Sequence, residues 1–254
     1  MLLAIDIGNT HTVIGVFERD RLIGDWRITS DTARTEDEIG IFVKSFCKNS
    51  SIDPELIVRS GISSVVPNLT PIYQKMTKKY FDIEPTIISP ALNLGITILY
   101  EDPSAVGTDR LCNAVAGYTQ YGGPLIIIDF GTATTYDVVS EQGEYLGGVI
   151  APGVETSSAE LHRRAAKLPK IDTVFPEKAI GRTTITSMQS GILFGAVDSV
   201  EGMVKRIGAE LGKKPTVIGT GGLSAMISLQ TTVIDFVVPS LVLDGVRIIV
   251  DRQK

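Results

Sequence analysis

An internal repeat constrains the fold of this chain more than any other feature of its sequence. The segments Leu3–Thr10 and Ile126–Ala133 both run through three apolar residues, an aspartate, an apolar residue and a glycine. The similarity continues in three matched pairs: Thr12 with Thr135, Val16 with Val139, and Gly24 with Gly147. Each copy therefore predicts a strand, a glycine turn, a second strand, another turn and a third strand.

Two such copies about half a chain apart predict duplicated α/β lobes within the 254 residues. We expect an N-terminal lobe over residues 1–117 and a C-terminal lobe over residues 118–254. A cleft between two lobes is the default place for a ligand in such a protein.

The pattern of apolar residues predicts alternating strands and helices. Helical spacing predicts helices over 36–48, 70–80 and 187–211, and another that starts near Leu111. Short runs rich in β-branched residues predict strands over 2–6, 12–17, 21–28, 57–65, 85–88, 125–129, 134–139, 144–149, 215–219 and 233–238. This alternation is typical of an α/β protein whose sheets are covered by helices.

The two aspartates of the repeat, Asp6 and Asp129, each end a predicted buried strand and precede a glycine and hydroxyl residues. The glycine lets backbone N–H groups approach a phosphate, and the carboxylate suits a hydrated cation. One such loop is equally explained as a hairpin turn, since residues such as Asn9 favour tight turns. Two carboxylates at matched positions favour a pair of loops that clamp a triphosphate.

A third glycine-rich element, Gly219–Gly222, follows a predicted strand and opens a predicted helix. This context suits close approach of the backbone to a nucleotide, although a tight strand-to-helix crossover needs similar glycines. The element lacks the spacing of a dinucleotide-binding fingerprint, and no Gly-Lys-Ser/Thr follows it. Rossmann and P-loop folds are therefore disfavoured.

The segment Gly107–Leu111 precedes a helix with apolar periodicity. Thr108 or Asp109 is a good N-cap whatever the function of the protein. Asp109 also suits a general base that accepts the proton of a substrate hydroxyl, and Arg110 suits a bidentate grip on a substrate carboxylate. Both interpretations stay open at this point.

Composition excludes several other classes of function. A net charge of −5 without a basic block disfavours nucleic acid as a partner, and no apolar run is long enough to span a bilayer. The N-terminus lacks the pattern of a signal peptide, and two distant cysteines indicate reduced thiols, so we expect a cytoplasmic protein. Neither His11 nor His162 belongs to a zinc-ligand pattern, and no activated-serine motif occurs.

With these motifs in their order along the chain, the sequence resembles the type III pantothenate kinases of the acetate kinase, sugar kinase, Hsp70 and actin superfamily. The resemblance runs from about Leu2 to about Val250. The sequence departs from the family mainly at His11, where asparagine is more frequent, and at Thr108, where alanine also occurs. Its motifs are Asp6–Thr10, Gly107–Arg110, Asp129–Thr135 and Gly219–Gly222, with supporting stretches at 35–38, 63–67, 147–153, 164–169 and 188–191.

The resemblance implies two ribonuclease H-like (actin-like ATPase) lobes with an interlobe cleft. It further implies ATP-dependent phosphorylation of pantothenate to 4'-phosphopantothenate, the first step of coenzyme A biosynthesis. The enzyme would be a cytoplasmic homodimer that needs Mg²⁺ and a monovalent cation, K⁺ or NH₄⁺. A kinase for another small hydroxy acid or sugar, or an actin-like ATP-binding regulator without catalysis, stays open as the alternative.

The resemblance also implies roles for individual residues. Asp109 is the general base, Asp129 ligates K⁺, and Asp6 positions Mg²⁺ through water. The residues expected at ATP are Asp6, Ile7, Gly8, Asn9, Thr10, His11, Thr12, Val13, Thr132, Gly219, Gly221 and Gly222. The residues expected at pantothenate are Tyr100, Gly107, Thr108, Asp109, Arg110 and Thr184.

The predicted helix 187–211 carries more apolar residues than one sheet-facing stripe needs, Val197 and Val204 among them. We therefore expect it to pack against a second copy of the chain. The alternative is a helix buried within one copy.

Overall fold

The computed structural model describes residues 1–253, and its contacts divide the chain into two units. The first unit comprises Met1–Gln120 and the C-terminal segment from Leu241, and the second comprises Tyr121–Ser240. Every predicted strand is present, with ends that shift by a few residues. No helix among the described residues is both long and apolar enough to cross a membrane.

The sheet of the first unit has the strand order β3-β2-β1-β4-β5. Strands β1, β2 and β3 form an antiparallel meander, and β4 pairs in parallel with β1. The bounds are β1 (Leu2–Ile7), β2 (His11–Glu18), β3 (Arg21–Thr29), β4 (Arg59–Ser64) and β5 (Thr86–Ile87).

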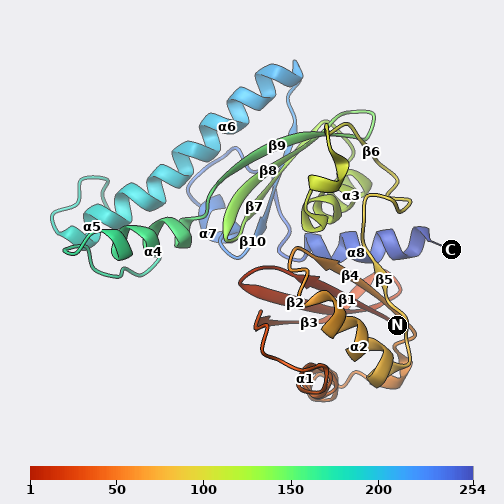
Figure 1. Ribbon diagram of the computed structural model, residues 1–254. Coiled ribbons are helices and arrows are strands. Elements are labelled where there is room, and N and C mark those ends of the chain that lie inside the picture. The colour runs from red at the N-terminus through yellow and green to blue at the C-terminus, as the bar shows by residue number, and fades with distance from the viewer. Residues whose placement is uncertain (254) are drawn as a thin grey trace. The chain divides into compact units, whose positions relative to one another are not determined.

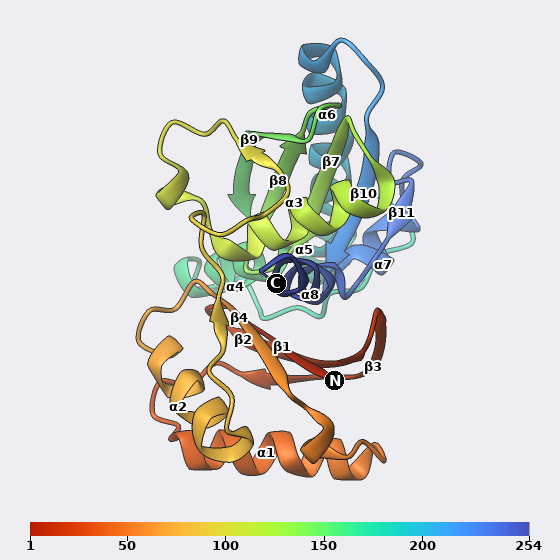
Figure 2. The same cartoon turned by 90° about the vertical axis from the view of Figure 1, so that its right-hand side faces the viewer.

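Two helices, α1 (Glu36–Asn49) and α2 (Thr70–Phe81), cover one face of this sheet (Figure 2). Helix α1 starts at a capping box, in which Thr35 and Glu38 satisfy each other's backbone N–H groups. Alternate residues of β1 point to these helices because side chains alternate between the faces of a strand. The core here contains Leu3, Ile5 and Ile7 of β1 together with Ile39, Val43, Tyr73 and Met76 of the two helices.

Helix α8 (Leu241–Arg252) packs on the other face of the first sheet. Small residues stand side by side there, because Ala4 of β1 pairs with Gly15 of β2 and with Gly61 of β4. A Cβ atom on Gly15 would lie 2.8 Å from Leu243, and one on Gly61 would lie 2.5 Å from Val250. The missing side chains therefore let α8 approach the strands closely.

The second unit repeats the strand arrangement of the first. Its strands run in the order β9-β8-β7-β10-β11, again with an antiparallel meander and a parallel neighbour. The bounds are β7 (Leu125–Phe130), β8 (Ala133–Val139), β9 (Glu144–Pro152), β10 (Thr216–Gly221) and β11 (Phe236–Val237). The internal repeat of the sequence therefore corresponds to a repeat of topology.

The predicted helix 187–211 is part of a longer helical run with an interruption. Helix α5 (Thr184–Gln189) continues through the π-helical turn η3 (Ser190–Phe194) into α6 (Gly195–Leu211), which lies along the sheet in Figure 1. The Ser190 hydroxyl donates to the Ala179 carbonyl at 2.5 Å in the middle of this interruption. The apolar face of α6 contributes Val197, Val200 and Ile207 to the core of the second unit.

Helix α3 (Thr108–Tyr121) follows the motif at Gly107, as its periodicity predicts. Helices α4 (Val154–Arg164) and α8 were not predicted, whereas α7 (Ser224–Ser228) is the helix expected after Gly219–Gly222. The remaining short elements are η1 (Pro54–Leu56), η2 (Pro103–Ala105) and β6 (Thr97–Ile98).

Candidate active site

The first aspartate loop is a tight connection between β1 and β2. The Gly8 N–H donates to the His11 carbonyl at 3.0 Å, and a Cβ on Gly8 would lie 2.9 Å from that oxygen. The Ser30 hydroxyl donates to the Gly8 carbonyl at 2.6 Å. The loop therefore is a fixed hairpin, and the exposed positions Asn9, Thr10 and His11 surround its tip.

Other residues expected at ATP have different surroundings. Ile7 and Thr12 are fully buried, and the Thr12 hydroxyl is 2.9 Å from that of Ser30. Val13 is half-buried in β2. The side chains of Ile7 and Thr12 therefore pack below the loop, and the contact of these residues with ATP stays a prediction. Ser30 is a residue that supports the loop and that sequence reasoning missed.

The second aspartate loop connects β7 and β8 in the second unit. The Gly131 N–H donates to the Ala133 carbonyl at 3.1 Å, which resembles the bond that closes the first loop. The Thr132 carbonyl accepts from the Thr156 hydroxyl at 2.6 Å and from the Gly153 N–H at 3.2 Å. Thr132 itself is exposed.

The glycines at the end of β10 meet the second loop, because β10 is the parallel neighbour of β7. Gly221 has a φ of +84°, and a Cβ there would contact the Asp129 carboxylate and lie 2.8 Å from the Phe130 carbonyl oxygen. Glycine is needed at this position for both reasons. The structure therefore brings together Asp129 and the element Gly219–Gly222, whose spacing in sequence did not connect them.

The motif Gly107–Arg110 begins helix α3 in the first unit. Asp109 Oδ1 accepts the backbone N–H of Arg110 at 2.8 Å, and a Cβ on Gly107 would collide with that carboxylate oxygen. Asp109 is half-buried, whereas Arg110 is buried with 8% of its surface exposed. Glycine at 107 leaves the space that the Asp109 carboxylate occupies.

Burial of Asp109 raises the pKa of its carboxyl group, because the charged form loses contact with water. The N–H of Arg110 and its guanidinium charge oppose this change. The thiol of Cys112 is fully buried, and its pKa is raised well above the usual value by burial and by the charges of Asp6 and Asp109. The carboxylates of Asp6 and Asp109 are therefore both close enough to Cys112 to raise the pKa of its thiol.

A short chain of hydrogen bonds joins the first loop to the motif at α3. The Ser63 hydroxyl at the end of β4 donates to Asp6 Oδ1 at 2.8 Å and lies 3.1 Å from the Thr108 hydroxyl. The Ser64 N–H donates to the Thr108 hydroxyl at 2.9 Å. Sequence reasoning did not assign a role to Ser63, although hydroxyl residues at the end of a predicted strand were the available signal.

Two of the residues expected at pantothenate lie outside these clusters. Tyr100 precedes η2 in the first unit and is 38% exposed. Thr184 begins α5 in the second unit, and the Thr183 hydroxyl caps that helix through the Thr186 N–H at 3.1 Å. Their contact with a substrate stays a prediction.

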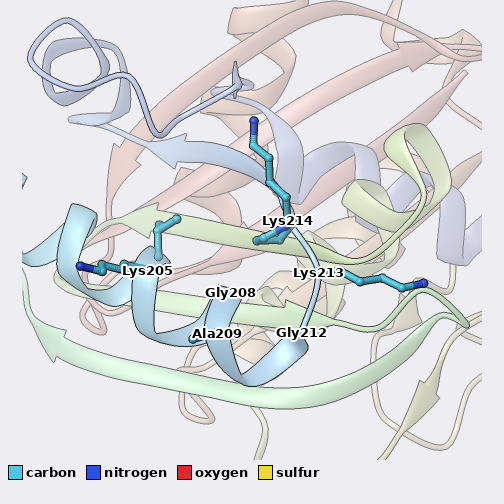
Figure 3. A pocket seen from close by; sticks show the side chains of 8 residues that line it. Lys205, Gly208, Ala209, Gly212, Lys213 and Lys214 are labelled. Carbon is cyan, nitrogen blue, oxygen red and sulfur yellow. The ribbon is translucent and has the colours of Figure 1, made fainter.

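A shallow depression lies at the other end of β10, and Figure 3 shows the residues around it. Lys205, Lys213 and Lys214 surround it, but their side chains point in different directions (Figure 3), and Lys213 is ion-paired with Glu141. The depression precedes β10, whereas the glycines lie at the opposite end of that strand. It therefore is not part of the aspartate-loop site.

Solved structures with similar folds support one class of protein. A protein of Campylobacter jejuni described within the Baf family of transcriptional activators is 18% identical, with a TM-score of 0.65 over 99% of this chain and 98% of that one. Component A of (R)-2-hydroxyglutaryl-CoA dehydratase from Acidaminococcus fermentans is 13% identical, with a TM-score of 0.55 over 97% of this chain and 94% of that one. Inorganic polyphosphate/ATP-glucomannokinase from Arthrobacter sp. strain KM is 14% identical, with a TM-score of 0.51 over 100% of this chain and 99% of that one.

The duplicated sheets and these similarities define a protein of the actin-like ATPase fold. Similarity of fold alone does not identify a reaction. The sequence model of the type III pantothenate kinases matches residues 2–206, and the chain belongs to this family. It is thus a phosphotransferase that uses ATP and pantothenate, as the resemblance of its motifs predicted.

Proposed function

We propose that the chain transfers the γ-phosphoryl group of ATP to the hydroxyl group of pantothenate, with Asp109 as the general base. The observation that supports this most directly is the chain of hydrogen bonds from Asp6 through Ser63 to Thr108. It joins a phosphate-type loop to the helix that carries a half-buried carboxylate. Phosphoryl transfer depends mainly on positioning and charge stabilisation, and this arrangement supplies both.

Asp109 suits the role of general base because its pKa is raised by burial. A base is most effective when its pKa approaches the operating pH, so a raised carboxyl pKa favours proton abstraction from the substrate hydroxyl. In this proposal Arg110 and Gly107 contact pantothenate together with Tyr100, Thr108 and Thr184. The exposed tip of the first loop and Thr132 contact ATP with the Gly219–Gly222 element.

Asp6 is the residue that we propose for Mg²⁺. The described residues contain no group of three or more His, Cys, Asp or Glu side chains that could hold a metal ion. One half-buried carboxylate fits Mg²⁺ nevertheless, since this ion usually keeps several waters and binds one or two carboxylates plus substrate phosphates. When bound with ATP, Mg²⁺ would neutralise phosphate charge.

Asp129 is the residue that we propose for the monovalent cation. Its carboxylate and the Phe130 carbonyl both lie where a side chain on Gly221 would collide. Carboxylate and carbonyl oxygens are suitable ligands for K⁺ or NH₄⁺, and these two oxygens lie close together beside Gly221.

Activity should therefore fall when Na⁺ replaces K⁺ at constant ionic strength, because the oxygen ligands are expected to suit the larger ion. ADP release at saturating ATP measures this effect. NH₄⁺ should restore the rate, and the Asp129→Asn variant should lose the difference between K⁺ and Na⁺. Equal rates of the wild type in both salts would contradict the assignment of Asp129.

We also propose a homodimer in the cytoplasm. Met188, Val197, Val200 and Ile207 are buried within the second unit, so the intramolecular alternative accounts for much of the apolar surface of that helical run. Other apolar side chains nearby in sequence remain uncovered, with Ile180 85% exposed and Ile185 47% exposed. These two side chains favour a contact between copies close to Thr184.

Light scattering at micromolar concentration should report about twice the mass of 27.3 kDa. The Ile185→Glu variant should dissociate and bind pantothenate more weakly, because a charge would be buried at the contact. Leu229→Glu is a matched control at an apolar residue that is 82% exposed. A fully active wild-type monomer at assay dilution would contradict the dimer.

An assay of ADP release with a panel of hydroxylated acids and sugars tests the function itself. Pantothenate should give the highest kcat/KM, and mass spectrometry should identify 4'-phosphopantothenate as the product. A clear preference for another acid or sugar would favour the alternative kinase. Nucleotide binding without any acceptor-dependent ADP release would favour a regulator.

A further inference from the structure

We propose that Ser63 is a positioning residue that orients the Asp6 carboxylate and couples it to the start of helix α3. The inference rests on the proposed function, in which Asp6 and Asp109 serve the transfer. Ser63 is fully buried, so it acts on the reaction through its neighbours and does not touch substrate.

The donors and acceptors of Asp6, Ser63 and Thr108 fix the direction of the hydrogen bonds between them. A hydroxyl group has one proton to donate, and an ionised carboxylate can only accept. Ser63 donates its proton to Asp6 at 2.8 Å, so in its 3.1 Å contact with Thr108 it must accept. The Thr108 proton is therefore shared between the Ser63 hydroxyl and the Ser64 carbonyl, which also lies at 3.1 Å.

Backbone hydrogen bonds hold both ends of this series of hydrogen bonds in place. Asp6 and Ser63 are directly paired residues of the parallel strands β1 and β4. At the other end, the Ser64 N–H donates to the Thr108 hydroxyl at 2.9 Å, and Thr108 is the first residue of α3. The Ser63 hydroxyl is therefore the link between the sheet edge that carries Asp6 and the helix that carries Asp109.

The second unit repeats the placement of a hydroxyl residue beside the loop aspartate. Thr220 of β10 is paired with Asp129 of β7, as Ser63 of β4 is paired with Asp6 of β1. The internal repeat thus includes a hydroxyl residue on the neighbouring parallel strand, which the sequence comparison of the two loops did not reveal.

The test is Ser63→Ala, with Ser60→Ala as a matched control on the same strand. Ser60 is also buried, with 2% of its surface exposed, but its hydroxyl has no hydrogen-bond partner among the described residues. Loss of a residue that orients a metal-associated carboxylate typically costs about 10–100-fold in activity or metal affinity. We expect Ser63→Ala to lose that much in kcat, whereas Ser60→Ala keeps the wild-type rate.

Two further measurements separate positioning from a merely structural role. The KM for pantothenate should stay within about 2-fold of the wild type, because Ser63 contacts no substrate. Calorimetry should show weaker binding of ADP with Mg²⁺ in Ser63→Ala but unchanged binding of ADP without Mg²⁺. A structural defect would weaken ADP binding in both conditions.

A Ser63→Ala protein with wild-type kcat and wild-type Mg²⁺-dependent ADP binding would overturn the inference. If Ser63→Ala does not fold, Ser63→Cys replaces it in the same measurements, because a thiol is a weak donor of nearly the same size. An unchanged kcat in Ser63→Cys would also overturn the inference. If the wild type fails to phosphorylate pantothenate, the proposed function is wrong, and ADP calorimetry still decides the role of Ser63.

Discussion

The Asp109→Asn variant should phosphorylate pantothenate about 10²–10⁴-fold more slowly than the wild type, which is the usual contribution of a general base. Asparagine keeps the size of the side chain and accepts the Arg110 N–H, but it cannot take up the proton of the substrate hydroxyl. Folding should change little, because the variant also removes a carboxylate whose charged form is disfavoured by burial. Single-turnover kinetics and thermal unfolding measure the two effects.

The pH dependence of the wild type provides a second readout of the same residue. A base must be deprotonated, so kcat/KM should fall as the pH falls through the pKa of Asp109, which burial raises. The fall in kcat/KM should occur at a pH above the usual pKa range of an aspartate, and the Asp109→Asn variant should not show it. Asp102→Asn is the control, since Asp102 is an exposed N-cap of η2. Near-normal turnover by folded Asp109→Asn would refute the assignment of Asp109 as the general base.

The Gly245→Ala variant should have a free energy of unfolding lower by about 1–3 kcal/mol, the usual cost of overpacking. Gly245 is buried in α8, where a Cβ would collide with the backbone carbonyl of Cys112 and lie 2.6 Å from its Cα. A helix backbone cannot move aside as a flexible side chain can. Urea unfolding measures the loss, and the shift of α3 should also lower kcat because the same helix carries Asp109.

The matched control for this variant is Gly202→Ala in α6. No atom lies within 4 Å of a Cβ built on Gly202, so alanine there should gain its helix propensity of about 1 kcal/mol. Opposite signs for the two substitutions would attribute the loss at 245 to the crossing of α3 and α8. Equal stability of Gly245→Ala and the wild type would show that the two helices can separate without cost.

Local patterns were sufficient for the meanders and for helices such as α1. Helix α1 combines apolar periodicity with a capping box at Thr35, and both signals are local. Helix α8 was missed, although Asp244, Arg247 and Asp251 lie on one polar face, because most of its apolar residues are β-branched and favour strands. Its helical state depends on burial between neighbours, and a local pattern does not contain them.

The candidate site also combines residues that are neighbours in the sequence with residues that only the fold brings together. The repeat around Asp6 and Asp129 and the pair Asp109–Arg110 were recognisable because their residues are consecutive in the sequence. Ser63 belonged to the supporting stretch 63–67 of the resemblance, but its role was not recognisable, because that role depends on the pairing of β1 with a strand more than 50 residues away. The contact between Gly221 and Asp129 likewise arises only when β10 pairs with β7.

By itself, the sequence determined the duplicated α/β architecture, the two aspartate loops and the family to which the chain belongs. Each of these features depends on a short segment, because turn formation and the alternation of side chains along a strand involve only a few consecutive residues. Only the tertiary structure decided that the segment from Leu241 packs on the first sheet and that Ser63 joins Asp6 to Thr108. Parallel strand pairing and close helix packing bring together residues far apart in the chain, and the free energy of those contacts is not encoded in any one segment.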